Sequence, residues 1–351
     1  MEYNILLPST WKLLVFSSYF SYNTQKGDET MPHPGILYPT SLYNIDTWKS
    51  DRVARYSGSD RKDGVISPDG RRYLIKYASR HTRKNDMDTS YVNNVLSEYL
   101  SSHILTIIGY PVHDTFLATR SDQLVVACEN FIPDNKELIE FGHYMRKQYD
   151  SVEIGRVPKY SQIKQILSTD PDLKTNPDLW DNYCMRFVGD ALTGNFDRHM
   201  GNWGYLVSKT NPDEPPEPAP VYDNGSTLFP ALSSEAMKNE VLTSAKEILR
   251  RTILFPKAAM SIQTNKVSYL DMLSSNFDSA MTQAVLRMVP VIQRKMPDIF
   301  IFIDAQTFLS DTKKTFYKAI LQARLNFLLK PAYENRVLLF PRQKDRQIKP
   351  V

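Results

Sequence analysis

The hydrophobic pattern of this chain changes near Pro133, and this change limits the folds that the chain can adopt. Between about Tyr43 and Ile132, short apolar runs alternate with turn residues, and one stretch has helical spacing. After Pro133 the apolar residues recur mostly at helical spacing. The sequence therefore predicts an α+β fold with two lobes, a β-rich N-lobe and a mainly helical C-lobe, with a ligand cleft between them.

We divide the 351 residues into three parts, which are an extension over residues 1–30, an N-lobe over 31–132 and a C-lobe over 133–351. The first part is fairly apolar, but Pro8 and Lys12 interrupt it. It lacks the basic segment and the small-residue cleavage site of a signal peptide, and it is too short and broken to cross a bilayer. We expect an extension here, with a signal peptide as the alternative.

Charge and cysteine content exclude several classes of protein. The net charge of +4, from 43 basic and 39 acidic residues, is too small to indicate direct nucleic-acid binding. The two cysteines, Cys128 and Cys184, lie in apolar surroundings and form neither a disulfide framework nor a zinc motif. We expect both to pack in the core of a cytoplasmic protein.

The N-lobe contains recognisable strand and helix signals. The stretch "GVISPDGRRYLIKYA" predicts a hairpin that turns at "SPDG". The stretch "DTSYVNNVLSEYLSSHILTIIG" predicts a helix with Asp88 or Thr89 as its N-cap and Gly109 just beyond its end. Residues 110–132 predict two further strands around a polar turn.

In the C-lobe, "DLWDNYCMRFVGDALTGN" predicts an amphipathic helix that ends at Gly194. We expect Trp203–Val207 to form a hairpin with Val221–Tyr222. The Pro-rich acidic stretch between them, "NPDEPPEPAP", is expected to be a solvent-exposed insertion. The region after Ser234 is predicted to be rich in helices, two of them with long apolar stripes.

The stretch "GNFDRHMGNWGYL" carries the strongest chemical signal. Asp197 and Asn202 are five positions apart on a loop between a predicted helix and a predicted strand. Protein kinases use this spacing in their catalytic loop, where the Asp accepts the hydroxyl proton and the Asn binds Mg²⁺. Asp223, in "PVYDNGS", follows where kinases place a second metal ligand. Carboxylate and amide oxygens suit a hard cation.

A kinase site also needs a positive charge on the phosphates. Lys76 ends an apolar strand in "RRYLIKYA", and Glu98 follows in the order required for a lysine–glutamate ion pair. The stretch "RYSGSDRKDGV" contains Gly58 and Gly64 and could wrap phosphate oxygens with its backbone N–H groups. It is neither a Walker motif nor a full G-x-G-x-x-G motif, so this signal alone is weak.

Taken in order, "SGSDRK", "LIKYAS", "SEYLSSHILTIIGYPV", "GNFDRHMGNWG" and "PVYDNG" resemble the HipA-like serine/threonine kinases of bacteria. The family pattern D-x-H-x-x-N matches Asp197, His199 and Asn202. The resemblance implies a bilobal kinase-like fold and ATP- and Mg²⁺-dependent phosphorylation of Ser or Thr on a protein. It implies Asp197 as base, Lys76 on the phosphates, and Asn202 and Asp223 as metal ligands.

The resemblance further implies autophosphorylation in the phosphate loop, here at Ser57 or Ser59. We assign His199 to the catalytic group together with Asp197 and Lys76. The residues assigned to ATP binding are Ser57, Gly58, Ser59, Lys62, Lys76, Glu98, Glu129 and Phe131.

About fifty residues precede the phosphate loop, too few for the extra N-terminal subdomain of full-length toxins in this family. The chain therefore resembles the short members, some of them stand-alone effectors and others parts of split toxin systems. The expected partners are a protein substrate and a small antitoxin-like protein, without direct contact to nucleic acid or membrane. The expected location is the cytoplasm, with secretion as an effector as the alternative.

Several alternatives stay open at this level. His199 either takes part in proton transfer or is a hydrogen-bonded loop residue that positions Asp197 or the nearby backbone. Arg198 lies either on the surface or on a phosphate. At the level of function, the rivals are a small-molecule kinase and a regulatory pseudokinase that acts through a partner protein.

Overall fold

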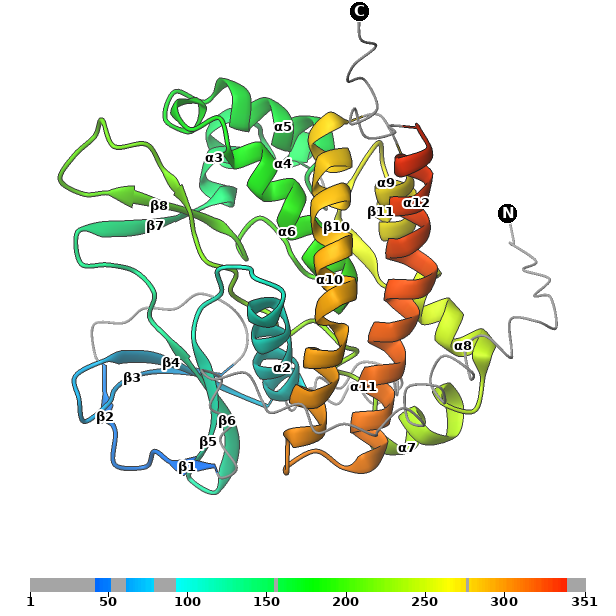
Figure 1. Ribbon diagram of the computed structural model, residues 1–351. Helices are drawn as coiled ribbons and strands as arrows, with labels where there is room; N and C mark the ends of the chain where they lie inside the picture. The colour runs from blue at the N-terminus through cyan, green and yellow to red at the C-terminus, as the bar shows by residue number, and fades with distance from the viewer. Residues whose placement is uncertain (1–41, 52–60, 79–92, 155–156, 276–277, 340–351) are drawn as a thin grey trace, which may run out of the picture.

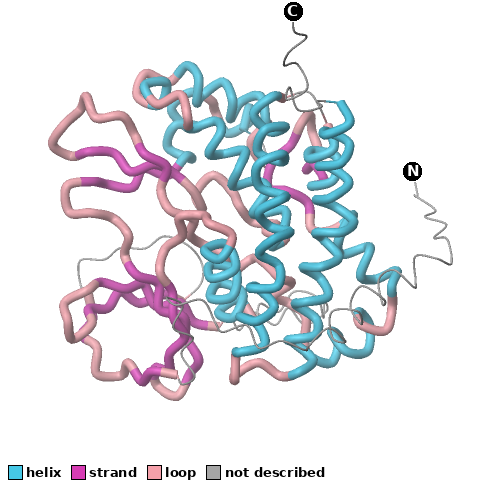
Figure 2. The backbone as a smooth tube through the Cα atoms, in the orientation of Figure 1, coloured by secondary structure: helices cyan, strands magenta, loops and turns pink. Residues whose placement is uncertain are grey.

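The computed structural model describes residues 42–51, 61–78, 93–154, 157–275 and 278–339. A β-rich part built mainly from the first third of the chain lies beside a larger helical part (Figures 1 and 2). The predicted α+β class with a β-rich and a helical portion is therefore confirmed.

The β-rich part is one six-stranded sheet with the order β1-β5-β6-β4-β3-β2. Neighbouring strands are antiparallel except β1, which pairs with β5 in parallel. One face holds a small apolar core around Val65, Ile75 and Val125, and the other face packs against helix α2 (Asn94–Ile107). The strands are β1 (Tyr43–Asn44), β2 (Lys49–Ser50), β3 (Lys62–Ile66), β4 (Arg72–Tyr77), β5 (Thr115–Arg120) and β6 (Gln123–Glu129).

Most N-lobe predictions are confirmed. Strands β3 and β4 form the predicted hairpin, with Val65 opposite Tyr73. Strands β5 and β6 are the two strands predicted after the helix. The helix begins at Asn94, after Asn93 as N-cap, and the predicted N-caps Asp88 and Thr89 lie outside the described residues. Its end is as predicted, since Gly109 has a φ of 91°, which favours glycine.

The helical part contains α3 to α12, a three-stranded sheet with the order β7-β8-β9, and the hairpin β10-β11. Helices α6 and α10 pack against each other in its core, and α10, α11 and α12 form the layer seen in Figure 1. The helices are α3 (Phe141–Gln148), α4 (Ser151–Ile154), α5 (Tyr160–Thr169), α6 (Leu179–Thr193), α7 (Ser234–Ala236), α8 (Ala245–Leu249), α9 (Tyr269–Ser274), α10 (Ser279–Ala305), α11 (Asp311–Arg324) and α12 (Lys330–Leu339).

The C-lobe strands differ from the prediction in two ways. Strand β7 (Lys136–Glu140) lies in a region predicted to be helical, and it pairs with β8 (Gly204–Ser208). Strand β8 then pairs with β9 (Glu217–Pro218), not with Val221–Tyr222, so the predicted hairpin partner is wrong. Val221 instead forms a parallel bridge with Val112.

The Pro-rich acidic stretch also has more contact with the rest of the protein than predicted. It contains the whole of β9. The half-buried Glu214 and the exposed Glu217 both pair with Lys136, at 2.9 and 2.8 Å. Lys136 lies in β7, so these ion pairs reinforce the β7-β8-β9 sheet.

Helix α6 ends as predicted, because Gly194 follows it with a φ of 70° in the left-handed region. A Cβ at Gly194 would meet the guanidinium of Arg324 at 3.0 Å, so both backbone conformation and space favour glycine. The loop that carries Asp197 starts directly after this glycine. None of the helices in the described part of the chain is long and apolar enough to span a membrane.

Candidate active site

Lys76 is the centre of the candidate active site. Its Nζ donates to Glu98 Oε2 at 2.8 Å and to Asp223 Oδ1 at 2.9 Å. Burial alone would lower the pKa of Lys76, but the two carboxylates outweigh burial and raise this pKa above its usual value. The predicted lysine–glutamate ion pair is therefore present, and the lysine carries a full charge.

Glu98 lies on α2 and is fully buried, which requires compensating partners. Besides Lys76, it accepts a hydrogen bond at Oε1 from Nε2 of the buried His113, at 3.0 Å. Burial raises the pKa of Glu98, but Lys76 and His113 outweigh it and the net shift is downward. Glu98 therefore stays ionised and holds Lys76 in one position.

Asp223 lies in a loop after Val221 and has a φ of 56°, which is uncommon for a residue with a side chain. Burial raises the pKa of its carboxyl group, but Lys76 outweighs this and the net shift is downward. Only Oδ1 is bound to Lys76, and no described residue donates to Oδ2. An ionised carboxylate oxygen is thus available to a cation.

The loop over residues 195–202, which we call the catalytic loop, positions the backbone of Asp197. The Asp197 N–H donates to Asn195 Oδ1 at 3.0 Å, and the His199 N–H donates to the Asp197 carbonyl at 2.7 Å. No described residue donates to the Asp197 carboxylate. Burial raises its pKa, partly offset by His199. A half-buried carboxylate with a raised pKa is suited to accept a proton.

Asn202 is oriented by the same loop. Its amide nitrogen donates to the Asp197 carbonyl at 2.7 Å, so its Oδ1 faces another direction and accepts no hydrogen bond from the described residues. Asn202 and Asp223 therefore each present one oxygen that could bind a hard cation such as Mg²⁺.

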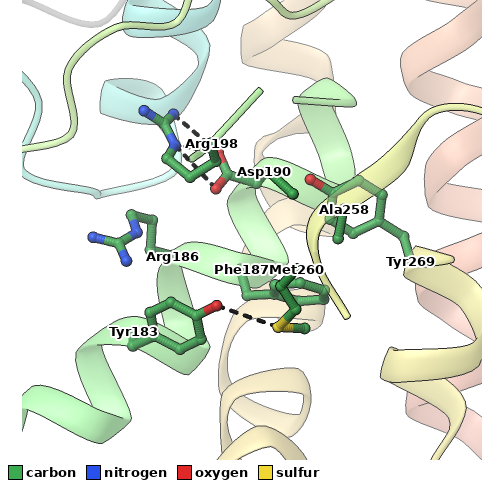
Figure 3. A pocket seen from close by; sticks show the side chains of 9 residues that line it. Tyr183, Arg186, Phe187, Asp190, Arg198, Ala258, Met260 and Tyr269 are labelled. Atoms are coloured by element: carbon green, nitrogen blue, oxygen red, sulfur yellow. Dashed lines mark hydrogen bonds and ion pairs between the residues drawn. The ribbon is translucent and has the colours of Figure 1, made fainter. Parts of the chain in front are cut away.

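Arg198 links the loop of Asn202 to the loop of Asp223. Its Nη1 donates to the carbonyl groups of Asn202 at 3.1 Å, of Tyr222, and of Asp223 at 3.3 Å. Its Nη2 lies 3.0 Å from Oδ1 of Asp190 on α6, as Figure 3 shows. The predicted surface position of Arg198 is wrong, because the side chain is buried. The alternative, a phosphate contact, stays a prediction.

His199 is exposed, and its Nδ1 accepts a hydrogen bond from the Gly201 N–H at 3.0 Å. This contact fits the interpretation of a loop histidine that positions the backbone. Its assignment to the catalytic group stays a prediction.

The residues assigned to ATP binding lie in different parts of the structure. Lys62 lies opposite Lys76 in the β3–β4 pairing, and its charge contributes to the low pKa of Asp223. The Glu129 carboxylate accepts from Arg71 and Tyr73, both at 3.1 Å, so it stabilises strand β4. The Phe131 ring stacks on Tyr222, next to Asp223, with centroids 5.4 Å apart. The predicted residues Ser57, Gly58 and Ser59 lie outside the described residues.

Sequence reasoning missed the buried groups that hold these residues. Two of these groups, Asp190 and Asn224, bind Arg198, and the third, His113, binds Glu98. Asn224 also donates to Ser102 of α2 at 3.0 Å. In the site, the partners of Asp190, His113 and Asn224 lie 8, 15 and 26 residues away along the chain, beyond the reach of a local motif. The one available signal is Asn224 itself, directly after Asp223 in "PVYDNGS".

A pocket lies behind the catalytic loop, between α6, β10 (Lys257–Ser261) and Tyr269 of α9 (Figure 3). Arg198 and Asp190 line it, but Lys76, Glu98 and Asp223 do not. This pocket therefore does not include the cluster of Lys76, Glu98 and Asp223.

Comparisons with known proteins agree with this geometry. No protein-family model matches the chain. The serine/threonine-protein kinase CtkA of Helicobacter pylori strain J99 is 29% identical over 285 residues, which cover 79% of this chain and 83% of CtkA.

The crystal structure of a Helicobacter pylori proinflammatory kinase CtkA has a TM-score of 0.74 at 24% identity and covers 85% of this chain and 99% of that chain. HipA of Shewanella oneidensis MR-1, from a toxin–antitoxin complex with HipB and operator DNA, is more distant. Its TM-score is 0.49 at 15% identity, and the match covers 94% of this chain and 85% of that chain. The resemblance to bacterial serine/threonine kinases is thus confirmed, and the chain is a homologue of the serine/threonine-protein kinase CtkA that shares its kinase fold.

Proposed function

We propose that this protein is an ATP- and Mg²⁺-dependent serine/threonine protein kinase that transfers the ATP γ-phosphoryl group to a Ser or Thr hydroxyl. The observation that carries the proposal is the position of Lys76, whose ammonium binds Glu98 and Asp223 at once. This arrangement, in a fold shared with a kinase, matches the parts that phosphoryl transfer requires.

In this proposal, the chain's own residues position the reactants and neutralise charge. Lys76 binds the nucleotide phosphates, while Glu98 and His113 keep its ammonium in place. Asp197 accepts the proton of the attacking hydroxyl, which its accessible carboxylate and raised pKa support. Arg198 keeps the two loops of the site in register.

The donor groups fit a magnesium ion. Asn202 Oδ1 and Asp223 Oδ2 are hard oxygen atoms without a hydrogen-bond donor among the described residues, and Mg²⁺ prefers such ligands together with phosphate oxygens. When bound, the ion would neutralise phosphate charge.

We place the nucleotide base near the connection between β6 and β7. The backbone N–H of Phe131 donates to no described residue, which leaves it available to a base acceptor. The ring of Phe131 adds an apolar surface. Autophosphorylation at Ser57 or Ser59, a small antitoxin-like partner and a cytoplasmic location remain predictions of the resemblance, with secretion as the alternative location.

The test is transfer of label from γ-labelled ATP in the presence of Mg²⁺ to two classes of acceptor, a mixture of proteins and a mixture of sugars and aminoglycosides. Lys76→Met is the inactive control, expected to lower transfer at least about 100-fold. Label on Ser or Thr of protein supports the proposal. Label only on small molecules indicates a small-molecule kinase, and nucleotide binding without transfer indicates a regulatory pseudokinase.

A further inference from the structure

Residues 245–268, which we call the basic segment, contact Phe196, the residue before Asp197, through Lys266 and Phe255. The segment contains α8, the π-helical turn Arg250–Leu254, and the hairpin of β10 and β11 (Lys266–Ser268). It carries five basic side chains and a single carboxylate, Glu247. Five basic side chains and one carboxylate give the segment a net charge of +4.

The only carboxylate of the segment is already paired with two arginines. Glu247 pairs with Arg250 at 3.1 Å and with Arg251. Lys257 and Lys266, in contrast, are exposed and form no ion pair with the described residues. These two charges are free to attract an acidic partner.

Lys266 lies against the catalytic loop. Its Nζ is 3.4 Å from the carbonyl oxygen of Phe196, the residue directly before Asp197. Its charge also helps to lower the pKa of the Asp197 carboxyl group, which places the two side chains in the same electrostatic neighbourhood. A partner that reaches Lys266 is therefore close to Asp197.

An apolar surface adjoins the same point. The Phe255 ring stacks on Phe196 with centroids 6.2 Å apart, yet 43% of Phe255 is exposed. Its neighbour Leu254 is 42% exposed. Two consecutive large apolar side chains that remain exposed, one of them stacked on the catalytic loop, indicate a contact surface rather than core packing.

We propose that the basic segment binds the substrate protein and selects an acidic stretch that carries an apolar side chain near the phosphorylated Ser or Thr. Leu254 and Phe255 would contact the apolar side chain, while Lys257 and Lys266 would pair with the acidic ones. This inference rests on the proposed kinase function, because it names the substrate class of the same site.

The experiment uses the full chain with a positional library of Ser- and Thr-containing peptides and γ-labelled ATP. The wild type is expected to select Asp or Glu and an apolar residue near the acceptor. Lys257→Ala is expected to lower kcat/KM about fivefold for acidic peptides, the upper end of the range for an exposed ion pair, with neutral peptides unchanged. Lys266→Ala is expected to slow acidic peptides more than neutral ones, because Lys266 also contacts the catalytic loop. Lys174→Ala removes an exposed lysine outside the basic segment and is expected to match the wild type.

The apolar part is tested with Leu254→Ser, which is expected to lose the apolar preference while its thermal unfolding stays close to that of the wild type. Phe255 is less suitable, because it packs on Phe196 and Phe229.

Two results would overturn the inference. One is a wild type that phosphorylates the library without preference for acidic residues. The other is that Lys257→Ala and Lys266→Ala each slow acidic and neutral peptides equally, which would limit Lys266 to its contact with the catalytic loop. A wild type that labels no peptide and no protein would instead contradict the proposed kinase function itself.

Discussion

At the scale of single residues, the site depends on charged groups that are buried and paired. Arg198 shows this best, since its guanidinium binds Asp190 and three carbonyl groups of the two functional loops. A lysine cannot reproduce these contacts, because it has a single ammonium group in place of a planar fork of donors. Arg198 therefore acts as a positioning residue for Asn202 and Asp223.

We predict that Arg198→Lys lowers the rate of phosphoryl transfer at least about 100-fold, because small displacements of a catalytic group have effects of this size. The change also leaves Asp190 poorly paired, so we expect a loss of about 3 kcal/mol in the free energy of unfolding. Kinetics and denaturant unfolding check both values. Arg287→Lys, at an exposed position of α10, is the matched control. Wild-type rates in Arg198→Lys would contradict the positioning role.

At the scale of elements, helix α2 is held from both sides. Its Glu98 binds Lys76 of β4, while Tyr99 donates to Gln306, just after α10, at 3.3 Å. His103 of the same helix stacks on Phe302 of α10, with centroids 5.2 Å apart, and its Nδ1 lies 3.1 Å from the Tyr99 carbonyl. The position of Glu98 is therefore fixed by packing between the sheet and α10.

The contact between His103 and α10 gives a prediction on pH. Burial lowers the pKa of His103 from 6.5 to about 4. The unfolded chain therefore binds more protons than the folded chain between these values, so stability falls as pH drops from about 6.5 to about 4. The full effect is about 3 kcal/mol, since one pKa unit corresponds to about 1.4 kcal/mol.

Denaturant unfolding of wild type and His103→Gln at pH 7.5 and pH 4.5 tests this effect. We expect the stability difference between the two proteins to shift in favour of the variant at the lower pH. A difference that is the same at both pH values would show that His103 does not titrate in this way.

The elements also show what sequence reasoning can and cannot reach. The β3–β4 hairpin and the end of α6 were predictable, because "SPDG" and Gly194 are local signals with a local cause. Strand β7 and its pairing with β8 were not, because the pairing depends on contact across about 65 residues of sequence. One sign of this pairing in the sequence is Gly204, because a Cβ at this position would lie 2.2 Å from the Ile139 carbonyl oxygen.

The same division holds for the site. Motif order predicts Lys76, Glu98, Asp197, Asn202 and Asp223 as site residues, because phosphoryl transfer restricts the residue types. The structure brings Lys76, Glu98 and Asp223 together. Arg198 was misplaced because its partners, Asp190 on α6 and the loop of Asp223, come together only in the fold.

At the scale of the whole molecule, the proposed nucleotide and metal site joins the sheet, α2 and the two loops of the C-lobe. Ligands that bind only the folded state stabilise it by mass action, by about 2.7 kcal/mol at 100 times the dissociation constant. Binding at this site should therefore stabilise the molecule as a whole.

We predict that ATP with Mg²⁺ raises the unfolding temperature of the wild type more than ATP with a chelator does. Asp223→Asn is expected to lose this magnesium-dependent increment, because the amide lacks the charge of the carboxylate ligand. Asp271→Asn, at an exposed position of α9, is expected to keep it. An increment in Asp223→Asn equal to that of the wild type would exclude Asp223 as a metal ligand.

The central claim is that Asp197 serves as the base of a protein kinase. The most direct measurement is the rate of label transfer from γ-labelled ATP to Ser or Thr by wild type and Asp197→Asn, with nucleotide affinity measured in both. We predict a loss of about 100- to 10,000-fold in rate with nucleotide affinity and thermal unfolding close to those of the wild type. Equal rates of transfer in the two proteins would contradict the assignment.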